Sequence, residues 1–481
     1  MNGDDLIALA PLLVLAAGAI VVMLQAGFWR RHGWAASLTV LALIASLLVL
    51  PWAASVAPRR VTALLMIDGF ALFYLGLLCA AALAVTLLTY GYLYARGGLR
   101  EELYVLILTA TLGAAVLVAS THFASFFLGL ELLSVSLFAL VAYPVSRRQP
   151  LEAAVKYLVL SGLSSALLLF GIALIYFKIG VLDFAGVAAP ANLIRAPALL
   201  LAGFALLLAG LGFKLSLVPF HLWAPDVYEG APAPIAGFLA TVSKGAVAAL
   251  LLRYLSEAQV HAQPSLVAGL EAVALVSILV GNLLALLQDN LKRILAYSSI
   301  AHFGYLLVAF VVGGPFGHEA AAYYLAAYMV MTLGAFGVIA RLSAPDAEHD
   351  LGQLEDYRGL FWRQPWLGAV LTAMLLSLAG IPLTVGFVAK FYVFAIGVDG
   401  ARWALVAALV IGSVIGLFYY LRVISALFAQ PPASIPMAAL SAGSSAAASD
   451  VVLVVLTLLL VWFGVYPEPA MQLIRLTATL P

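Results

Sequence analysis

The chain has 481 residues, of which 65% are hydrophobic and only 9% are charged. A soluble domain carries about 25% charged residues, so this composition predicts a protein that crosses a membrane many times. The net charge of +1 favours neither a nucleic-acid partner nor an acidic one. The single cysteine, Cys79, excludes a disulfide within the chain and a cysteine-ligated iron–sulfur cluster.

The N-terminal segment starts acidic and lacks the basic start and small-residue cleavage site of a signal peptide, so we expect a retained first helix. Apolar runs close to the ~20 residues that span a bilayer then follow along the chain. They lie at about residues 6–24, 34–54, 70–94, 103–120, 122–143, 153–177, 197–222, 234–254, 265–287, 292–313, 319–342, 366–396, 402–428 and 450–466. The pattern predicts an all-α polytopic membrane protein with about fourteen transmembrane helices.

The basic residues of the connections predict the orientation of the helices, because cytoplasmic loops carry an excess of Lys and Arg. One set of alternate connections holds twelve of them: Arg30, Arg31, Arg96, Arg100, Arg147, Arg148, Lys292, Arg293, Arg341, Arg358, Arg363 and Arg422. The other set holds seven: Arg59, Arg60, Lys178, Arg195, Arg253, Arg402 and Arg475. We therefore expect the first set inside and both termini outside. The Ala-, Ser- and Pro-rich connection at 430–450 is interpreted as a flexible cytoplasmic strap.

Lys244 lies near the middle of its run, with about ten mostly apolar residues on each side. At 1.5 Å per residue its ammonium starts about 15 Å from either end of the helix, farther than a lysine side chain can reach. A charge at the centre of a bilayer costs about 2.5–3.5 kcal/mol or more, so such residues are functional candidates. The alternative interpretation is a structural ion pair with a buried carboxylate.

A second group of charges surrounds a proline in the segment GFKLSLVPFHLWAPDVYEGAPAP. Lys214 precedes Pro219, which removes a backbone donor and opens the helix. Such breaks persist inside membranes where they line a cavity or face protein. Glu131, in FASFFLGLELLSVSLF, is an isolated carboxylate that needs a cation or must stay protonated. Proton transfer and a structural pair both explain it.

A second interrupted span reads LSLAGIPLTVGFVAKFYVF, with Gly380 and Pro382 at the break and Lys390 after it. Two interrupted helices in the two halves of a transporter indicate an ion path. The order differs between the two, since lysine precedes proline in the first break and follows it in the second. The sequence alone therefore does not establish an internal repeat.

His302 is a weaker candidate. It lies mid-span near Ser298, Ser299 and Tyr305, and it can be interpreted either as a proton relay or as a core histidine whose hydrogen bonds are satisfied. Lys156 and Lys292 lie near the inner ends of their spans, where anchoring at the membrane surface explains them better than a functional role. Asp226 and Glu229 lie in a turn, where capping and turn formation explain them about as well as chemistry does. His221 follows Pro219 in the interrupted segment.

Several familiar chemistries have no motif here. The chain contains no G-x-x-x-x-G-K-[ST] loop, no G-x-G-x-x-G after a strand and no H-E-x-x-H. A haem held by His221 and His302 is disfavoured, because no histidine pair repeats on one helix face. No cofactor or metal site is predicted in this chain.

Six segments carry a resemblance to a known family: FLGLELLSVSLFALVAY, EAAVKYLVLSGLSSALLLFGIALIYF, GFKLSLVPFHLWAPDVYEGAPAP, TVSKGAVAALLLR, LKRILAYSSIAHFGY and GIPLTVGFVAKFYVF. In this order they resemble the antiporter-like, proton-translocating membrane subunits of respiratory complex I, which are related to subunits of multi-subunit cation/proton antiporters. The resemblance implies two five-helix units of inverted topology with broken helices 7 and 12. The implied divisions are residues 1–100, 101–258, 259–429 and 430–481.

The resemblance also implies roles for residues. Glu131 would pair with Lys214, Lys244 would be the central relay and Lys390 would pass the proton toward the periplasm. His221, His302, Lys156 and Lys292 match positions on the same polar axis. Flavin mononucleotide, iron–sulfur clusters and quinone would belong to partner subunits.

Implied partners are the peripheral arm, an antiporter-like subunit M, a small subunit K, the lateral helix of a subunit L and the lipid bilayer, in a bacterial inner membrane. Two other functions share these motifs or explain the buried charges. One is a subunit of a cation/proton antiporter or of a membrane-bound hydrogenase. The other is a structural membrane subunit with fixed ion pairs.

Overall fold

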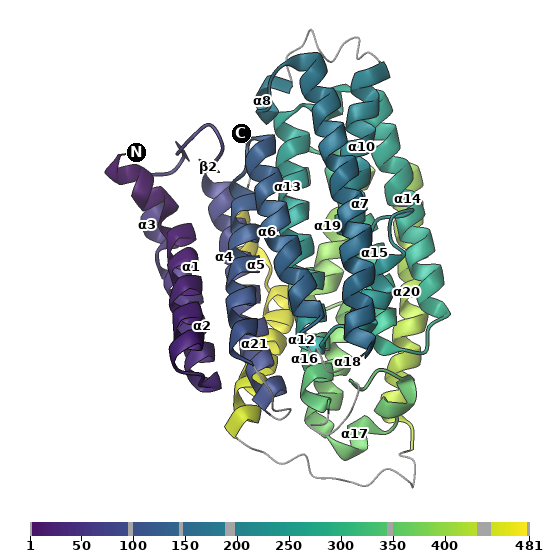
Figure 1. Ribbon diagram of the computed structural model, residues 1–481. Coiled ribbons are helices and arrows are strands. Elements are labelled where there is room, and N and C mark those ends of the chain that lie inside the picture. Colours follow the sequence, from purple (N-terminus) through teal and green to yellow (C-terminus); the bar gives the residue numbers. More distant parts are fainter. Residues whose placement is uncertain are drawn as a thin grey trace.

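The computed structural model describes residues 2–94, 100–143, 148–187, 198–343, 350–430 and 444–478, which are almost entirely helical. Thirteen helices of the described residues are long and apolar enough to cross a membrane. The shorter helices α18 (Pro365–Ala379) and α19 (Val385–Asp399) together form one more, interrupted crossing (Figure 1). The predicted all-α fold with about fourteen crossings is therefore confirmed.

The first part of the chain begins at one side of the molecule, forms a small hairpin and continues with helices that reach the opposite side (Figure 1). Two short antiparallel strands, β1 (Arg59–Arg60) and β2 (Met66–Ile67), make the hairpin. The helices are α1 (Gly3–Phe28), α2 (His32–Leu48), α3 (Leu50–Ala54), α4 (Gly69–Tyr94), α5 (Glu101–Ala119), α6 (Phe123–Val141), α7 (Arg148–Ile179), α8 (Phe184–Val187) and α10 (Ala198–Leu215). The expected spans at 6–24 and 153–177 are longer in the structure.

The middle of the chain continues with α11 (Trp223–Gly230), α12 (Ala233–Phe238), the π-helix η1 (Leu239–Ser243), α13 (Lys244–Glu257), the 3₁₀-helix η2 (Val260–Ala262), α14 (Pro264–Leu286), α15 (Leu291–Val312) and α16 (Gly314–Leu342). The remaining elements are the 3₁₀-helix η3 (Leu354–Tyr357), α17 (Leu360–Arg363), α18, α19, α20 (Trp403–Phe428), α21 (Ser444–Val465) and α22 (Glu468–Thr477). The expected strap lies mostly outside the described residues.

Three crossings form the centre of the bundle. In the apolar windows of α12–η1–α13 and α15 every residue is buried within the chain, and in α16 83% are. The same fraction is only 33% for α1 and 28% for α21. Polar side chains on the central helices are therefore removed from lipid, whereas the outer helices expose apolar side chains as a membrane requires.

The short join between α5 and α6 is extended rather than helical. Ser120 pairs with Leu65 and His122 with Asp183 in isolated antiparallel bridges. The imidazole of His122 also accepts a hydrogen bond from the Ala124 amide at 3.1 Å, which caps α6. The separation of two crossings at residues 120–122 is confirmed.

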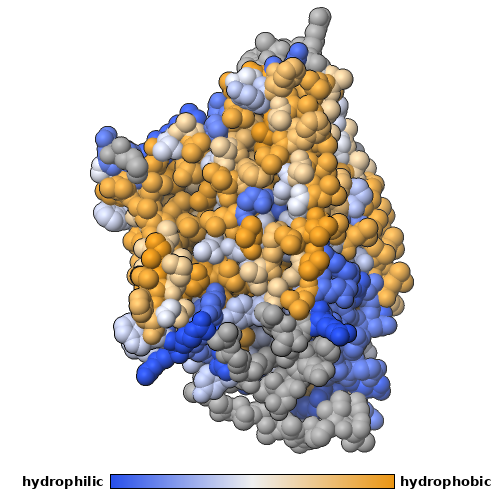
Figure 2. Space-filling model, viewed as in Figure 1, coloured by the Kyte–Doolittle hydropathy of each residue, from blue (hydrophilic) through white to orange (hydrophobic). Residues whose placement is uncertain are grey.

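Figure 2 shows a broad hydrophobic band over the visible face and hydrophilic residues gathered at the lower end. Both chain ends lie at the opposite, upper end in Figure 1, as an even number of crossings requires. Because the crossings alternate in direction, the described basic residues of the larger predicted set, such as Arg31, Arg293 and Arg422, lie at the lower end. We call this end the basic end. Arg96, Arg147 and Arg195 lie outside the described residues.

Candidate functional site

The first interrupted crossing breaks earlier than Pro219. Helix α10 ends at Leu215, and Ser216 adopts a left-handed conformation with φ of 59°. The Ser216 amide donates to Phe213 O at 2.9 Å and the Leu217 amide to Gly212 O at 2.7 Å. These two bonds are a Schellman motif, which satisfies carbonyl groups at a helix end. Pro219 then prevents the helix from resuming until α11 begins at Trp223.

Lys214, in the last turn of α10, lies in a layer of serines. Its Nζ donates to Ser134 Oγ on α6 at 2.8 Å and to Ser161 Oγ on α7 at 2.6 Å. Glu131, one turn before Ser134, accepts a hydrogen bond from Ser165 Oγ at 2.6 Å. Ser161 and Ser165 are four residues apart, so they share one face of α7.

The structure therefore brings Glu131 and Lys214 into one polar layer, but no ion pair within 4.0 Å joins these two described side chains. The expected direct pair is replaced by contacts through the serines Ser134, Ser161 and Ser165. An ammonium at the C-terminal end of a helix is also favoured by the helix dipole. Lys214 is 5% exposed.

Lys244 is fully buried, with 0% of its surface exposed. Its Nζ donates to Ser299 Oγ on α15 at 2.8 Å and lies 5.3 Å from the ring centre of Tyr228 and 5.2 Å from that of Phe303. Among the ion pairs of the described residues, none includes Lys244. The alternative of a structural ion pair for Lys244 therefore has no support in the structure.

The local helix geometry presents Lys244 in an unusual way. The π-helix η1 ends at Ser243, directly before it, and a π-turn inside an α-helix often marks a functional site. One extra residue in the turn rotates the side chains that follow relative to those before. Thr241 bonds its hydroxyl back to Gly237 O at 2.6 Å within this turn.

The second interrupted crossing uses the same motif as the first. Gly380 ends α18 with φ of 90°, its amide donates to Ser377 O at 2.9 Å, and the Ile381 amide donates to Leu376 O at 3.1 Å. This is again a Schellman motif, here with the expected glycine. Lys390, on α19, reaches back so that its Nζ donates to Ala379 O at 2.9 Å.

His302 joins the space between Lys244 and Lys390 through hydroxyl groups. Its Nδ1 lies 2.7 Å from the Tyr324 hydroxyl and its Nε2 3.4 Å from that of Tyr420. The Tyr420 hydroxyl also bonds to Ser298, the neighbour in sequence of Ser299. Lys390 lies 5.3 Å from the ring centre of Tyr305. Of the neighbours expected from the sequence, only Ser298 bonds to a direct partner of His302 among the described residues, and those partners, Tyr324 and Tyr420, come from α16 and α20.

His221 lies inside the first break and is 6% exposed. Among the residues that the structure describes, none meets hydrogen-bond geometry with either ring nitrogen of His221 or with the hydroxyl of Ser216. Buried polar atoms of this kind are normally satisfied by water. The break is therefore lined by polar groups that water molecules can bind.

Lys292 is 2% exposed, so the anchoring of its side chain at the surface, expected from its place near a helix end, is wrong. Its Nζ donates to Ala231 O at 2.6 Å and forms an ion pair with Asp350 at 3.1 Å. Lys156, by contrast, has an exposed side chain that pairs with Glu152 at 2.8 Å and Asp226 at 3.1 Å. Only the second of these lysines behaves as the surface interpretation predicts.

Asp226 and Glu229 are held by a side chain from another helix. Arg293 Nη1 lies 2.8 Å from a carboxylate oxygen of each. Asp226 lies in the first turn of α11, where an acidic residue is favourable, but the N-cap is Leu222 and no side-chain hydrogen bond caps this helix, so the capping interpretation is wrong. The two carboxylates therefore link α11 to the start of α15.

Sequence reasoning missed a buried arginine. Arg253 is 1% exposed and donates to both carboxylate oxygens of Asp68, at 2.9 and 2.7 Å, with Glu257 at 3.2 Å. Its guanidinium also lies 4.7 Å from the centre of the Phe70 ring. The sequence analysis counted Arg253 among the basic residues of a connection, whereas it lies inside α13. Its partner is 185 positions away, which no local pattern reveals.

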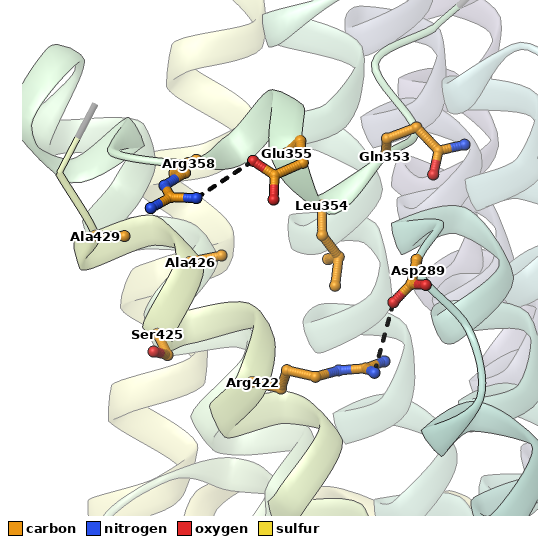
Figure 3. Close-up of a pocket in the computed structure, with 9 residues that line it drawn as sticks. All are labelled: Asp289, Gln353, Leu354, Glu355, Arg358, Arg422, Ser425, Ala426 and Ala429. Carbon is orange, nitrogen blue, oxygen red and sulfur yellow. Dashed lines mark ion pairs between the residues drawn. The ribbon is translucent and has the colours of Figure 1, made fainter. Parts of the chain in front are cut away.

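Figure 3 shows a pocket of about 520 Å³ at the basic end, lined by Asp289, Gln353, Leu354, Glu355, Arg358, Arg422, Ser425, Ala426 and Ala429. Arg422 lies 3.6 Å from Asp289, and Arg358 lies 3.7 Å from Glu355. None of the three buried lysines Lys214, Lys244 and Lys390 lines this pocket. The pocket therefore does not open directly onto these three lysines.

Residues 120–416 match the protein family described as NADH:quinone oxidoreductase/Mrp antiporter, transmembrane region. The chain is 52% identical over 473 residues to NADH-quinone oxidoreductase subunit N of Methylococcus capsulatus, an alignment that covers 98% of this chain and 94% of that one. It is 50% identical to the protein of the same name from Ectopseudomonas mendocina, covering 98% and 97% of the two chains.

Solved structures give the same result. A chain of respiratory complex I from Thermus thermophilus with bound aureothin aligns with a TM-score of 0.82 at 33% identity, over 96% of this chain and 98% of that chain. A chain of the Mrp complex from Dietzia sp. aligns with a TM-score of 0.86 at 18% identity, over 99% and 97% of the two chains, which shows a common fold.

A length near 480, the EAAVKY segment and the lysine at position 390 predict, within the resembled family, the subunit called N. The names of the relatives confirm this prediction. The match to the family covers more than half of the chain, and the relatives align over nearly all of it. The chain therefore belongs to the NADH:quinone oxidoreductase/Mrp antiporter membrane family, among the relatives of NADH-quinone oxidoreductase subunit N.

Proposed function

We propose that this chain is a proton-translocating membrane subunit of an NADH:quinone oxidoreductase. The observation that carries the proposal is Lys244, which is fully buried, donates to Ser299 Oγ and has no counter-ion among the described ion pairs. An uncompensated buried ammonium costs several kcal/mol. A structural subunit gains nothing from that cost, whereas a proton relay needs a lysine that can hold and release a proton.

The interaction between Glu131 and Lys214 is the step that changes during the proposed mechanism. Two unit charges 4 Å apart interact by about 4 kcal/mol at an effective dielectric near 20, close to three pKa units. Side-chain rotation of Glu131 away from Ser165 and toward Lys214 would strengthen this interaction. Rotation back would weaken it and release the proton of Lys214 toward Lys244.

The proposed path continues through hydroxyl groups. His221 and Ser216 line the break between Lys214 and α11. Beyond Lys244 the path follows Ser299, Ser298, Tyr420 and His302 toward Lys390. Lys390 would then release the proton outward, on the side away from the basic end. Hydrogen-bonded hydroxyl groups and water can carry a proton over distances that direct contact between lysines does not cover.

The two breaks support an internal repeat. Both end in a Schellman motif, both have a proline two or three residues later, and both place a lysine ammonium at the C-terminal end of the first half-helix. We propose that residues 101–258 and 259–429 are two five-helix units of inverted topology. Residues 1–100 and 430–481 would be additions at the two ends of the chain.

The orientation and the partners complete the proposal. The excess of Arg and Lys at the basic end supports a cytoplasmic position for that end and a periplasmic position for both termini, in a bacterium. Partner subunits would carry flavin mononucleotide, the iron–sulfur clusters and the quinone site. Direct neighbours would be an antiporter-like subunit M, the small subunit K and the lateral helix of subunit L. Identity of 50–52% to subunit N proteins over nearly the whole chain favours this assembly over an antiporter or hydrogenase.

The test replaces Lys244 by Met in the assembled complex. We expect proton pumping driven by NADH oxidation in inside-out membrane vesicles to fall by about tenfold or more, as for loss of a proton-transfer group. Assembly is measured on a native gel, and the partners that co-purify are identified by mass spectrometry. Assembled complex with wild-type pumping contradicts the relay. Co-purification of antiporter or hydrogenase subunits in place of flavin and iron–sulfur subunits contradicts the assembly.

A further inference from the structure

Lys292 and Asp350 form a buried ion pair near the basic end that the path described above does not use. The side chains are 2% and 6% exposed, with Nζ and Oδ2 3.1 Å apart. Asp350 also accepts hydrogen bonds from the Tyr92 hydroxyl at 2.7 Å and the Ala233 amide at 2.9 Å. The pair therefore sits where α4, α12 and α15 meet.

Two routes connect this pair to Lys244. On the first route, the Nζ of Lys292 donates to Ala231 O. Tyr228, three residues before Ala231, has the centre of its ring 5.3 Å from the Nζ of Lys244. The second route runs along α15. Lys292 and Ser299 are seven residues apart, two turns on one face or about 10 Å, and Ser299 holds Lys244.

We propose that Lys292 is the residue that takes up protons from the basic end and passes them to Lys244, with Asp350 as its positioning residue. This inference rests on the proposed function. In the transfer, an N–H bond of the Lys292 ammonium breaks and an N–H bond forms on the neutral amine of Lys244, through water or the Tyr228 hydroxyl. Lys292 then regains a proton from the solvent at the basic end, and Asp350 stays ionised throughout.

Lys292 and Asp350 are buried, but residues next to them in the chain reach the solvent. Arg293, the next residue, binds the carboxylates of Asp226 and Glu229, whose side chains are 36% and 32% exposed. The Leu291 amide donates to Gly352 O at 2.7 Å and the Leu354 amide to Asp289 O at 2.9 Å. Asp350 belongs to the same segment as Gln353, Leu354 and Glu355. These three residues line the open pocket of Figure 3.

Replacement of Lys292 by Arg separates a relay from a structural role. Arginine keeps the positive charge and can keep the ion pair with Asp350, but it is not deprotonated in proteins. Pumping per assembled complex in inside-out vesicles should fall by about tenfold or more in Lys292→Arg, as it does when a proton-transfer group is lost. Wild-type pumping in this variant overturns the inference.

A second variant decides the question if Lys292→Arg fails to assemble. In the double variant Lys292→Gln/Asp350→Asn the buried charges vanish together, and both amides can still form hydrogen bonds. A purely structural pair tolerates this change, because replacement of both members of a buried pair is often neutral. Retained pumping in the double variant overturns the inference, and assembled complex that does not pump supports it.

The matched control is Arg30→Gln, which removes an exposed ion pair with Glu102 at the same end of the molecule, with side chains 52% and 41% exposed. Its pumping should equal that of the wild type. Lys244→Met is measured in parallel. Wild-type pumping in Lys244→Met contradicts the proposed function itself. If Lys244→Met does not pump but Lys292→Arg pumps like the wild type, only the role of Lys292 is contradicted.

Discussion

The ammonium of Lys390 donates a hydrogen bond to the carbonyl oxygen of Ala379, the last residue of α18, at 2.9 Å. Lys214 occupies the last turn of α10, so both interrupted crossings hold a lysine at the C-terminal end of their first half. Helix C-termini carry a partial negative charge and unsatisfied carbonyl groups, which stabilise a cation. The opposite order of lysine and proline in the two sequences therefore leads to the same arrangement in space.

Glu131 should act through its charge rather than its length. In Glu131→Gln the amide oxygen can still accept the hydrogen bond from Ser165, but the field on Lys214 is lost. Glu131→Asp keeps the charge and shortens the side chain. We expect pumping in membrane vesicles to fall more in Glu131→Gln than in Glu131→Asp. Equal rates for the two variants at equal assembly contradict the electrostatic role.

Ser299 should be needed to keep Lys244 in place. Its hydroxyl accepts hydrogen bonds from Lys244 Nζ and from the Tyr328 hydroxyl, both at 2.8 Å. Ser299→Ala leaves a buried ammonium without its only hydrogen-bond acceptor among the described residues, at a cost of about 1–3 kcal/mol. We expect lower pumping at normal assembly. Thr111→Val is the control, because the Thr111 hydroxyl bonds only within its own helix, to Ile107 O.

Gly380 should tolerate no side chain. Its φ of 90° is left-handed, and a Cβ added there would lie 3.0 Å from Cδ of Lys390. Gly380→Ala should lose about 1–2 kcal/mol from the backbone alone and displace Lys390 from Ala379. The thermal midpoint of the purified complex and its pumping should both decrease. Gly162→Ala is the control, since nothing lies within 4 Å of its Cβ position in α7, and a decrease of the same size there contradicts the explanation.

His302 should matter less than Lys214. The His302 ring is one of several groups in the hydroxyl network, which Tyr324, Tyr420 and Ser298 also form. Water can replace one member of such a network, whereas Lys214 is the only cation that bonds to Ser134 and Ser161 among the described residues. We therefore expect His302→Ala to retain more pumping than Lys214→Ala at equal assembly. The reverse ranking would move the histidine into the main path.

The sequence by itself determined the class of the protein, the approximate number of crossings and which two spans are interrupted. These depend on local properties: runs of about 20 apolar residues, a proline that removes a donor and a glycine that ends a helix. It also identified Lys214, Lys244 and Lys390, because an ionisable residue inside an apolar run needs no partner to be noticed. It did not indicate the hydrogen-bond partners of His302, because Tyr324 and Tyr420 lie on other helices, 22 and 118 positions away.

Only the tertiary structure decided what these charges touch. Glu131 meets Lys214 through serines of two further helices, and Lys292 finds Asp350 58 positions away. Helix packing brings together residues whose spacing in the chain follows no period, so no sequence pattern encodes the pairs. The depth of a side chain is likewise a property of the neighbours of its helix. Lys156 and Lys292 have similar places in their sequence runs, but one is exposed and the other is buried.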